Sequence, residues 1–153
     1  MSITDLSWSN EYVLGIDIID EQHQKLFSYL EEINTAIKQG DARVVENVVR
    51  GMVDYAISHN NFEETLMERA GYPELAAHRE AHDKFRERAN VYVTRLENKA
   101  DPFKLAEQVR VFLGLWLISH VKQDDRDYAP FVRKSLKANS SILSSISRFF
   151  KSS

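Results

Sequence analysis

Five histidines are the residues of this chain whose type and spacing are best suited to chemistry. His59 is followed four residues later by Glu63, and His78 is followed four residues later by His82. Residues four apart lie on one face of a helix, so each pair can present two donor atoms side by side. Because the sequence contains no cysteine, a metal ion here must bind through imidazole and carboxylate. This donor set suits iron, manganese or zinc.

The elements that must position these side chains are predicted to be four long helices. Apolar residues recur with helical spacing, and the 153 residues include only three prolines and five glycines. The helices are expected at residues 20–39, 41–70, 74–98 and 101–123. Asp20 and Asp41 are the expected N-caps of the first two helices, and Gly40 is an expected stop. Short connections favour an all-α, antiparallel up-down-up-down four-helix bundle.

This topology brings the histidines to one end of the bundle, where odd-numbered helices start and even-numbered helices end. His23 lies near the start of the first helix and His59 towards the end of the second. His78 and His82 lie near the start of the third, and His120 lies near the end of the fourth. Each is in phase with the apolar stripe of its helix and is expected to point inwards. Five imidazoles with one or two carboxylates exceed the ligands of one ion, which favours two metal ions bridged by carboxylates.

These motifs resemble the hemerythrin family, in particular its single-domain bacterial members, the bacteriohemerythrins. The resemblance rests on seven candidate ligands and on the short segments around them: Trp8, Gly15 to His23, Leu66-Met67, Tyr72-Pro73 and Trp116 to His120. It implies two iron ions joined by an oxo or hydroxo bridge. It also implies these ligands: His78, His82 and His120 on one iron, His23 and His59 on the other, and Glu63 and Asp125 bridging. In this family O2 binds at the open position of the two-histidine iron and takes one electron from each ion.

The bridging aspartate does not follow simple helical arithmetic. Asp124 is four residues after His120 and only about 40° around an ideal helix, whereas Asp125 is about 140° around. Geometry alone therefore selects Asp124, while the family pattern selects Asp125. We follow the family pattern, which requires the helix to loosen or end near Gln123.

Apolar neighbours of the candidate ligands are expected to form a ligand pocket. Leu117 lies one turn before His120 and matches a pocket leucine of the family. Leu26, Phe85 and Trp116 also lie within a turn of ligands. Such a lining would exclude water and anions and so slow autoxidation.

The leading functional hypothesis is a non-enzymatic protein that binds O2 reversibly for storage, delivery or scavenging. One alternative is an oxygen or redox sensor that acts through a partner protein. Another is a diiron enzyme with peroxidase or nitric-oxide-reducing activity, and a third is simple metal storage. No glutamate is followed by histidine three residues on, which excludes the paired Glu-x-x-His sites of ferritin-like enzymes.

The remaining sequence suggests how the chain is organised and where it acts. We expect an N-terminal arm at residues 1–19, the bundle at 20–131 and a tail at 132–153. Ile142, Leu143, Ile146, Phe149 and Phe150 have helical spacing, so the tail could be an amphipathic helix that contacts a membrane surface or a partner protein. A net charge of -3 argues against nucleic-acid binding. We find no signal peptide and no membrane span, so a cytoplasmic protein is expected.

Overall fold

The protein is entirely helical in the computed structural model, which describes residues 6–138. No strand occurs among these residues. The elements are a short 3-10 helix η2 (Asn10–Tyr12), α1 (Asp17–Gln39), α2 (Ala42–Ala70), α3 (Leu75–Glu97), α4 (Pro102–Ser119), a π-helix η3 (His120–Asp125) and α5 (Arg126–Ala138).

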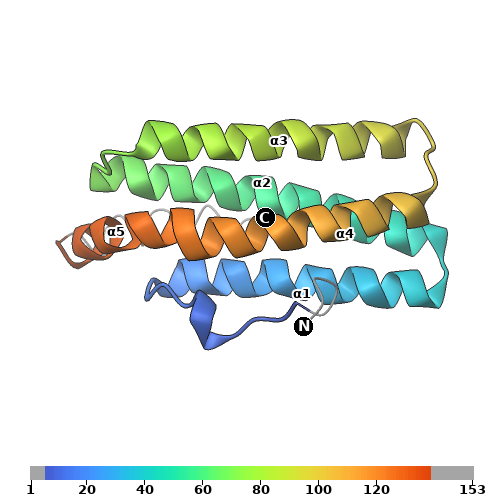
Figure 1. Ribbon diagram of the computed structural model, residues 1–153, viewed down its shortest axis with the longest axis horizontal. Helices are drawn as coiled ribbons and strands as arrows, with labels where there is room; N and C mark the ends of the chain where they lie inside the picture. The colour runs from blue at the N-terminus through green and yellow to red at the C-terminus, as the bar shows by residue number, and fades with distance from the viewer. Residues whose placement is uncertain (1–5, 139–153) are drawn as a thin grey trace.

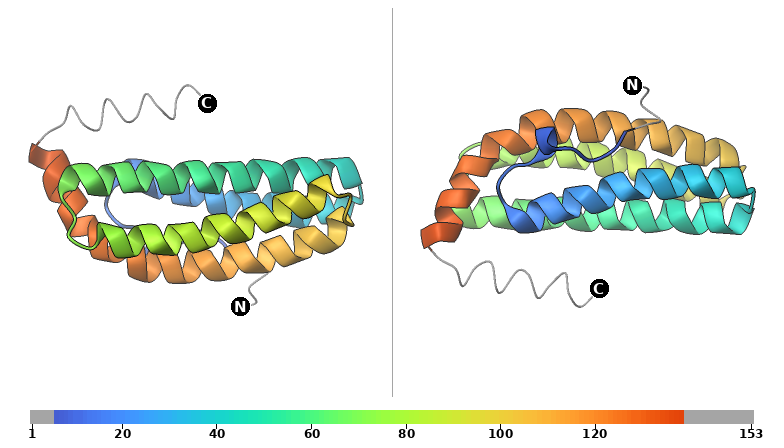
Figure 2. Two further views of the ribbon diagram at one scale, coloured as in Figure 1. Left: turned by 90° about the horizontal axis from the view of Figure 1, so that it is seen from above. Right: turned by 90° about the horizontal axis from the view of Figure 1, so that it is seen from below.

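Four long helices run alternately up and down and form the expected antiparallel bundle (Figure 1). α1 and α3 begin at the end of the bundle where α2 and α4 finish. α5 continues from α4 through η3 and crosses that same end (Figure 2). The prediction that the starts of odd helices meet the ends of even helices is therefore confirmed.

Several helix ends follow from local capping. The Asp41 carboxylate accepts hydrogen bonds from the backbone N–H groups of Arg43 and Val44 at the start of α2. Gly40 and Gly71 end α1 and α2 with φ of 75° and 66°. Glycine adopts this left-handed conformation without the steric cost that a β-carbon imposes. The stop predicted at Gly40 is therefore confirmed.

The predicted N-cap of the first helix was wrong. α1 begins at Asp17 rather than Asp20, so Asp20 lies in its first turn. The buried Asp20 carboxylate instead accepts hydrogen bonds from the backbone N–H of Leu14 at 2.9 Å and of Gly15 at 3.2 Å. Asp20 therefore anchors the preceding arm to α1. In the sequence, an aspartate with this role looks the same as an N-cap aspartate.

The C-terminal part of the bundle also differs from the prediction. The fourth helix was expected to run to about Gln123, but α4 ends at Ser119, and η3 and the 13-residue α5 then extend the helical path to Ala138. α5 thus runs across residue 131, where the bundle was expected to end and the tail to begin. Tyr128, Ala129 and Val132 share a buried face of α5, and their contact with the end of the bundle favours a helix here.

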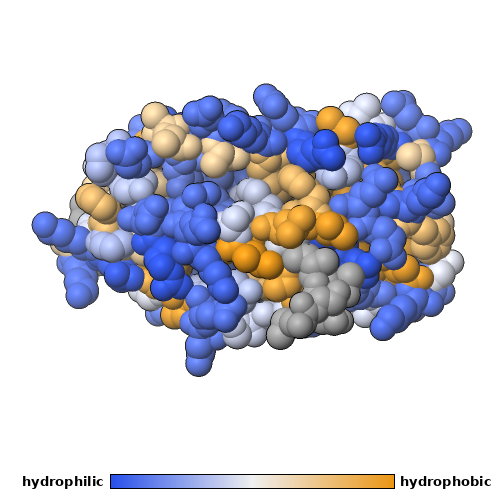
Figure 3. Space-filling view, viewed as in Figure 1, coloured by the Kyte–Doolittle hydropathy of each residue, from blue (hydrophilic) through white to orange (hydrophobic). Residues whose placement is uncertain are grey.

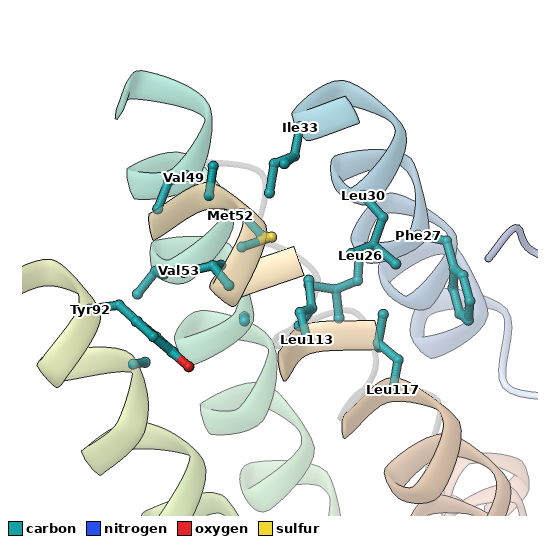
Figure 4. Close-up of a cluster of buried hydrophobic side chains, with 14 of the residues drawn as sticks. Leu26, Phe27, Leu30, Ile33, Val49, Met52, Val53, Tyr92, Leu113 and Leu117 are labelled. Atoms are coloured by element: carbon teal, nitrogen blue, oxygen red, sulfur yellow. The ribbon is translucent and has the colours of Figure 1, made fainter. Parts of the chain in front are cut away.

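Two clusters of buried apolar side chains flank the layer that holds the histidines. On α1 the smaller cluster ends at Ile19 and the larger begins at Leu26, on either side of His23. On α2 the larger cluster ends at Ala56 and the smaller resumes at Phe62. The larger cluster draws on all four long helices, and Figure 4 shows part of it. Burial of both clusters therefore holds the ligand-bearing turns in place.

The arm packs on the bundle over the part that the structure describes. Trp8 and Tyr12 contact Phe27 of α1, with ring centroids 5.8 and 4.6 Å apart. Tyr12 is buried, and Lys122 of η3 lies over its ring at 5.4 Å. The arm thus joins the start of the bundle to η3.

The outer surface is mostly hydrophilic on the face of Figure 3, with a hydrophobic patch near its middle. The large apolar side chains exposed on α4 are Val111 and Leu115. Among residues 6–138, no helix combines the length and apolarity that a membrane crossing needs. The predicted amphipathic tail, at residues 139–153, lies outside the described residues.

Candidate metal centre

The structure brings all seven predicted ligands together in one buried layer of the bundle. His78 is 5% exposed, and none of the others exceeds 1%. Their donor atoms form two groups: Glu63 with His78, His82 and His120, and Glu63 with His23, His59 and Asp125.

The three-histidine group is built from α2, α3 and η3. The Nε2 atoms of His82 and His120 are 3.1 Å apart, and Glu63 Oε1 lies 3.4 and 3.2 Å from them. Asp125 Oδ1 lies 3.2 Å from His78 Nε2 and 2.9 Å from His120 Nε2. Three imidazole nitrogens and two carboxylate oxygens therefore face a common point.

The two-histidine group is built from α1, α2 and η3. The Nε2 atoms of His23 and His59 are 3.1 Å apart. Glu63 Oε1 is 3.2 Å from His59 Nε2, and Asp125 Oδ2 is 3.1 Å from His23 Nε2. Asp125 thus directs one oxygen to each group, and Glu63 belongs to both.

Hydrogen bonds on the outer side of three imidazoles determine which nitrogens carry protons. The Nδ1 of His59 donates to Gln22 Oε1 at 2.7 Å, and that of His82 donates to Glu64 Oε2 at 2.9 Å. The Nδ1 of His120 lies 3.3 Å from Asp124 Oδ2. In a neutral ring the proton then sits on Nδ1, so Nε2 turns its lone pair inwards.

This arrangement fits metal ions. Lone pairs on the Nε2 atoms of His82 and His120 would face each other at 3.1 Å, which is unfavourable unless a metal ion or a proton lies between them. The buried His78 Nε2 and both Asp125 oxygens also have no hydrogen-bond partner. Two donors bound at right angles to one ion, at about 2.1 Å each, would be about 3.0 Å apart. Most separations given above, from 2.9 to 3.4 Å, agree with this value, whereas His23 Nε2 and Glu63 Oε2 are 3.8 Å apart.

The π-helix explains why Asp125, and not Asp124, points into this layer. A π-helix repeats over i to i+5, so Asp125 comes to lie above His120, five residues earlier. Asp125 is fully buried, whereas the Asp124 side chain is 45% exposed and contacts only the outer nitrogen of His120. The loosening expected near Gln123 is therefore present, and it begins at His120.

Comparison with known proteins agrees with this geometry. The family described as the hemerythrin HHE cation binding domain matches residues 14–132. The chain belongs to the hemerythrin family. A bacteriohemerythrin of Stenotrophomonas maltophilia (strain R551-3) is 37% identical over 131 residues, which cover 86% of this chain and 84% of the relative. A bacteriohemerythrin of Pseudomonas aeruginosa (strain LESB58) is 33% identical over the same shares. One from Methylococcus capsulatus is 26% identical over 128 residues, 82% of this chain and 95% of the relative.

The buried carboxylates of this hemerythrin-family centre are held in the charged form. Burial alone raises the pKa of Glu63, but the charge of His59 and hydrogen bonds from His120, His59 and His82 bring it well below its usual range. Burial and the charge of Glu63 raise the pKa of Asp125, yet His120 and His23 lower it overall. Two buried negative charges need compensation, which either protons or metal ions can supply.

Without metal, that compensation comes from the histidines. Burial lowers the pKa of His120, but Asp125, Asp124 and Glu63 raise it well above its usual value. The pKa of His82 is raised for a similar reason, by hydrogen bonds to Glu63 and Glu64 that outweigh burial. Metal ions must therefore displace protons from these rings, so metal affinity decreases as the pH is lowered.

Tyr128 of α5 is a further component of the centre, outside the predicted ligand set. Its fully buried hydroxyl donates to Glu63 Oε2 at 2.5 Å. Burial and the charges of Glu63 and Asp125 raise its pKa well above the usual value, so it stays a donor. Its place three residues after Asp125 would have indicated this contact had α5 been predicted.

Glu64 and Gln22 were not predicted to take part. Glu64 lies between His82 and two arginines, Arg79 at 3.2 Å and Arg86. Burial raises the pKa of Glu64, but hydrogen bonds from His82 and Arg86 lower it to about 2. Both residues adjoin a ligand in sequence, yet adjacency alone does not indicate a contact with a histidine on another helix.

The expected pocket residues lie on the side of the histidine layer that faces the larger apolar cluster. Trp116 stacks on His120 with ring centroids 4.2 Å apart and planes 16° apart, and Phe85 packs on Trp116 at 4.4 Å. Leu26 and Leu117 are fully buried in the larger cluster and point into the space between α1 and α4 (Figure 4). Aromatic and aliphatic groups therefore separate this side of the layer from solvent.

Proposed function

We propose that the chain binds O2 reversibly at a non-haem diiron centre and so stores, delivers or scavenges oxygen. Two ferrous ions held by the seven ligands would supply the two electrons that bound O2 takes up and returns on release. The name bacteriohemerythrin, carried by the relatives, supports this proposal.

The unequal sharing of donors between the two groups is the observation that carries the proposal. Glu63 and Asp125 serve both groups, so the group with His78, His82 and His120 has five protein donors. The group with His23 and His59 has four. An ion that prefers six ligands thus has more room on the two-histidine side, where a small ligand could bind.

The surrounding residues fit reversible binding rather than turnover. The lining of buried Leu26 and Leu117 and partly buried Trp116 keeps water away from the centre, which hinders loss of electrons to solvent species. The Tyr128 hydroxyl holds Glu63 Oε2 in place and remains protonated. These groups orient ligands and exclude water.

Iron content and an oxygen-dependent spectrum test the proposal. Metal-free protein would be loaded with Fe2+ under anaerobic conditions, assayed for iron, and followed optically as air is admitted and removed. Two irons per chain and a visible band that appears with O2 and disappears on its removal are expected. The protein loaded with zinc, which has no redox chemistry, is the control and should give no band.

Other outcomes would contradict the proposal. Two irons that oxidise once and do not return to the ferrous state would favour a sensor or a redox enzyme. A single iron per chain would contradict the shared roles of Glu63 and Asp125. A band that decays only in the presence of a reductant, with many turnovers, would favour a diiron enzyme.

A further inference from the structure

A surface pocket adjoins the metal centre between the start of α3 and the segment formed by η3 and α5. Its volume is about 200 Å³. It is lined by Tyr72, Glu74, Ala77, His78, Ala81, Asp124 and Asp127. The pocket is separate from the apolar lining around Leu26 and Leu117, which lies on the other side of the histidine layer.

Every charged side chain in this lining other than the histidine is a carboxylate. Glu74 and Asp127 are exposed at the rim, and Asp124 is half-buried. No lysine or arginine lines the pocket. Burial and then the charges of Asp127, Glu74 and Asp124 raise the pKa of Tyr72, which places all three carboxylates around one hydroxyl. The pocket therefore presents a negative field to a cation.

The pocket ends at a ligand of the metal centre. His78 forms part of its wall and is the most exposed of the seven candidate ligands, at 5%. The buried Nε2 of this ring has no hydrogen-bond partner and lies 3.2 Å from Asp125 Oδ1. Asp124 also spans both regions, since it lines the pocket and contacts His120 Nδ1. One imidazole ring therefore separates the carboxylates from the shared ligand Asp125.

We propose that this acidic pocket is the vestibule through which divalent iron reaches the metal centre, with His78 as the first ligand that it meets. This inference rests on the proposed function, because it requires the centre to bind iron. Carboxylates at the rim would raise the local concentration of Fe2+, and a clustered field of one sign can raise association rates by about 10- to 1,000-fold. Rotation of the His78 side chain would then pass the ion to Asp125 and His120.

A charge variant tests the vestibule by the rate of metal uptake. Metal-free Glu74→Gln/Asp127→Asn would be mixed anaerobically with Fe2+, and bound iron measured after timed quenching with a chelator. Asp124 is left intact because it contacts His120. We expect uptake about tenfold slower than in the unaltered protein at low ionic strength. The difference should largely vanish at about 0.5 M salt, where the screening length is about 4 Å, with the final iron content unchanged.

The matched control removes two carboxylates from another surface cavity. Glu31 and Glu32 line a groove between α1 and α2 that contains no candidate ligand. Glu31→Gln/Glu32→Gln changes the net charge by the same amount, and its uptake rate should stay within about twofold of the unaltered protein.

A steric variant tests the same path without changing charge. Ala77 lines the pocket, and Ala76 is an exposed neighbour on α3 that does not. Ala77→Leu should slow iron uptake at both salt concentrations, whereas Ala76→Leu should not.

Equal uptake rates for the unaltered protein, the charge variant and Ala77→Leu would overturn the vestibule. A lower final iron content in the charge variant would also overturn it, because these residues would then hold the ions rather than guide them. If the unaltered protein binds no Fe2+, the proposed function itself fails, a result distinct from equal uptake rates.

Discussion

Replacing Asp125 and its neighbour Asp124 gives the sharpest test of the metal centre. Asp125 directs two buried oxygens to His23, His78 and His120, at 2.9 to 3.2 Å. Asp124 contacts only the outer nitrogen of His120, at 3.3 Å. The two residues are adjacent and chemically identical, so each variant is the control for the other.

The expected magnitudes follow from the number of donors lost. Asp125→Ala removes one donor from each group, and we expect the chain to bind at most one iron. Asp124→Ala removes an outer hydrogen bond, which typically lowers metal affinity about 10- to 100-fold. That loss equals about 1.4 to 2.8 kcal/mol of binding free energy. Asp124→Ala should therefore still bind two irons when iron is in excess.

The assay measures iron per chain after gel filtration, together with the optical spectrum in the presence and absence of O2. Asp125→Asn keeps the side-chain volume and separates loss of a ligand from a failure to fold. It should also lose the diiron spectrum. Retention of both irons by Asp125→Ala, with their loss in Asp124→Ala, would refute the assignment and the role given to the π-helix.

Three further predictions concern residues around the centre. Tyr128→Phe removes the hydroxyl that donates to buried Glu63, and it should lower the free energy of unfolding of the metal-free protein by about 1.5 to 3 kcal/mol in urea denaturation; an unchanged midpoint would exclude this bond. Leu117→Ala creates a cavity at a fully buried site, so we expect a loss of about 2 to 5 kcal/mol and faster autoxidation in the loaded protein, whereas an unchanged autoxidation rate would remove Leu117 from the pocket. The pKa of Glu64 is lowered to about 2 in the folded chain, so its contribution to the stability of the metal-free protein is present above pH 4.5 and is lost as pH falls towards 2. Glu64→Gln should flatten the stability profile in that range, and a profile that remains as steep would contradict the contact with His82.

The residues of the metal centre could be predicted because their spacing is local. His59 and Glu63, or His78 and His82, share a helix face through the 3.6-residue repeat alone. Short connections then require neighbouring helices to run antiparallel, which places all five histidines at one end. Resemblance to a known family was needed to divide the ligands between two irons, to give Glu63 and Asp125 bridging roles, and to choose Asp125 over Asp124.

The tertiary structure decided what lies around those ligands. The contacts of Gln22 with His59 and of Tyr128 with Glu63 join residues 37 and 65 positions apart. Such pairs leave no periodic signal in the sequence. The widening of the helix at His120 likewise depends on packing, because one extra residue per turn becomes favourable only when it brings Asp125 between three imidazoles and lets α5 bury Tyr128. Local periodicity thus determined the bundle and the placement of the five histidines and Glu63, whereas packing between distant segments determined the position of Asp125 and the protonation, orientation and accessibility of the centre.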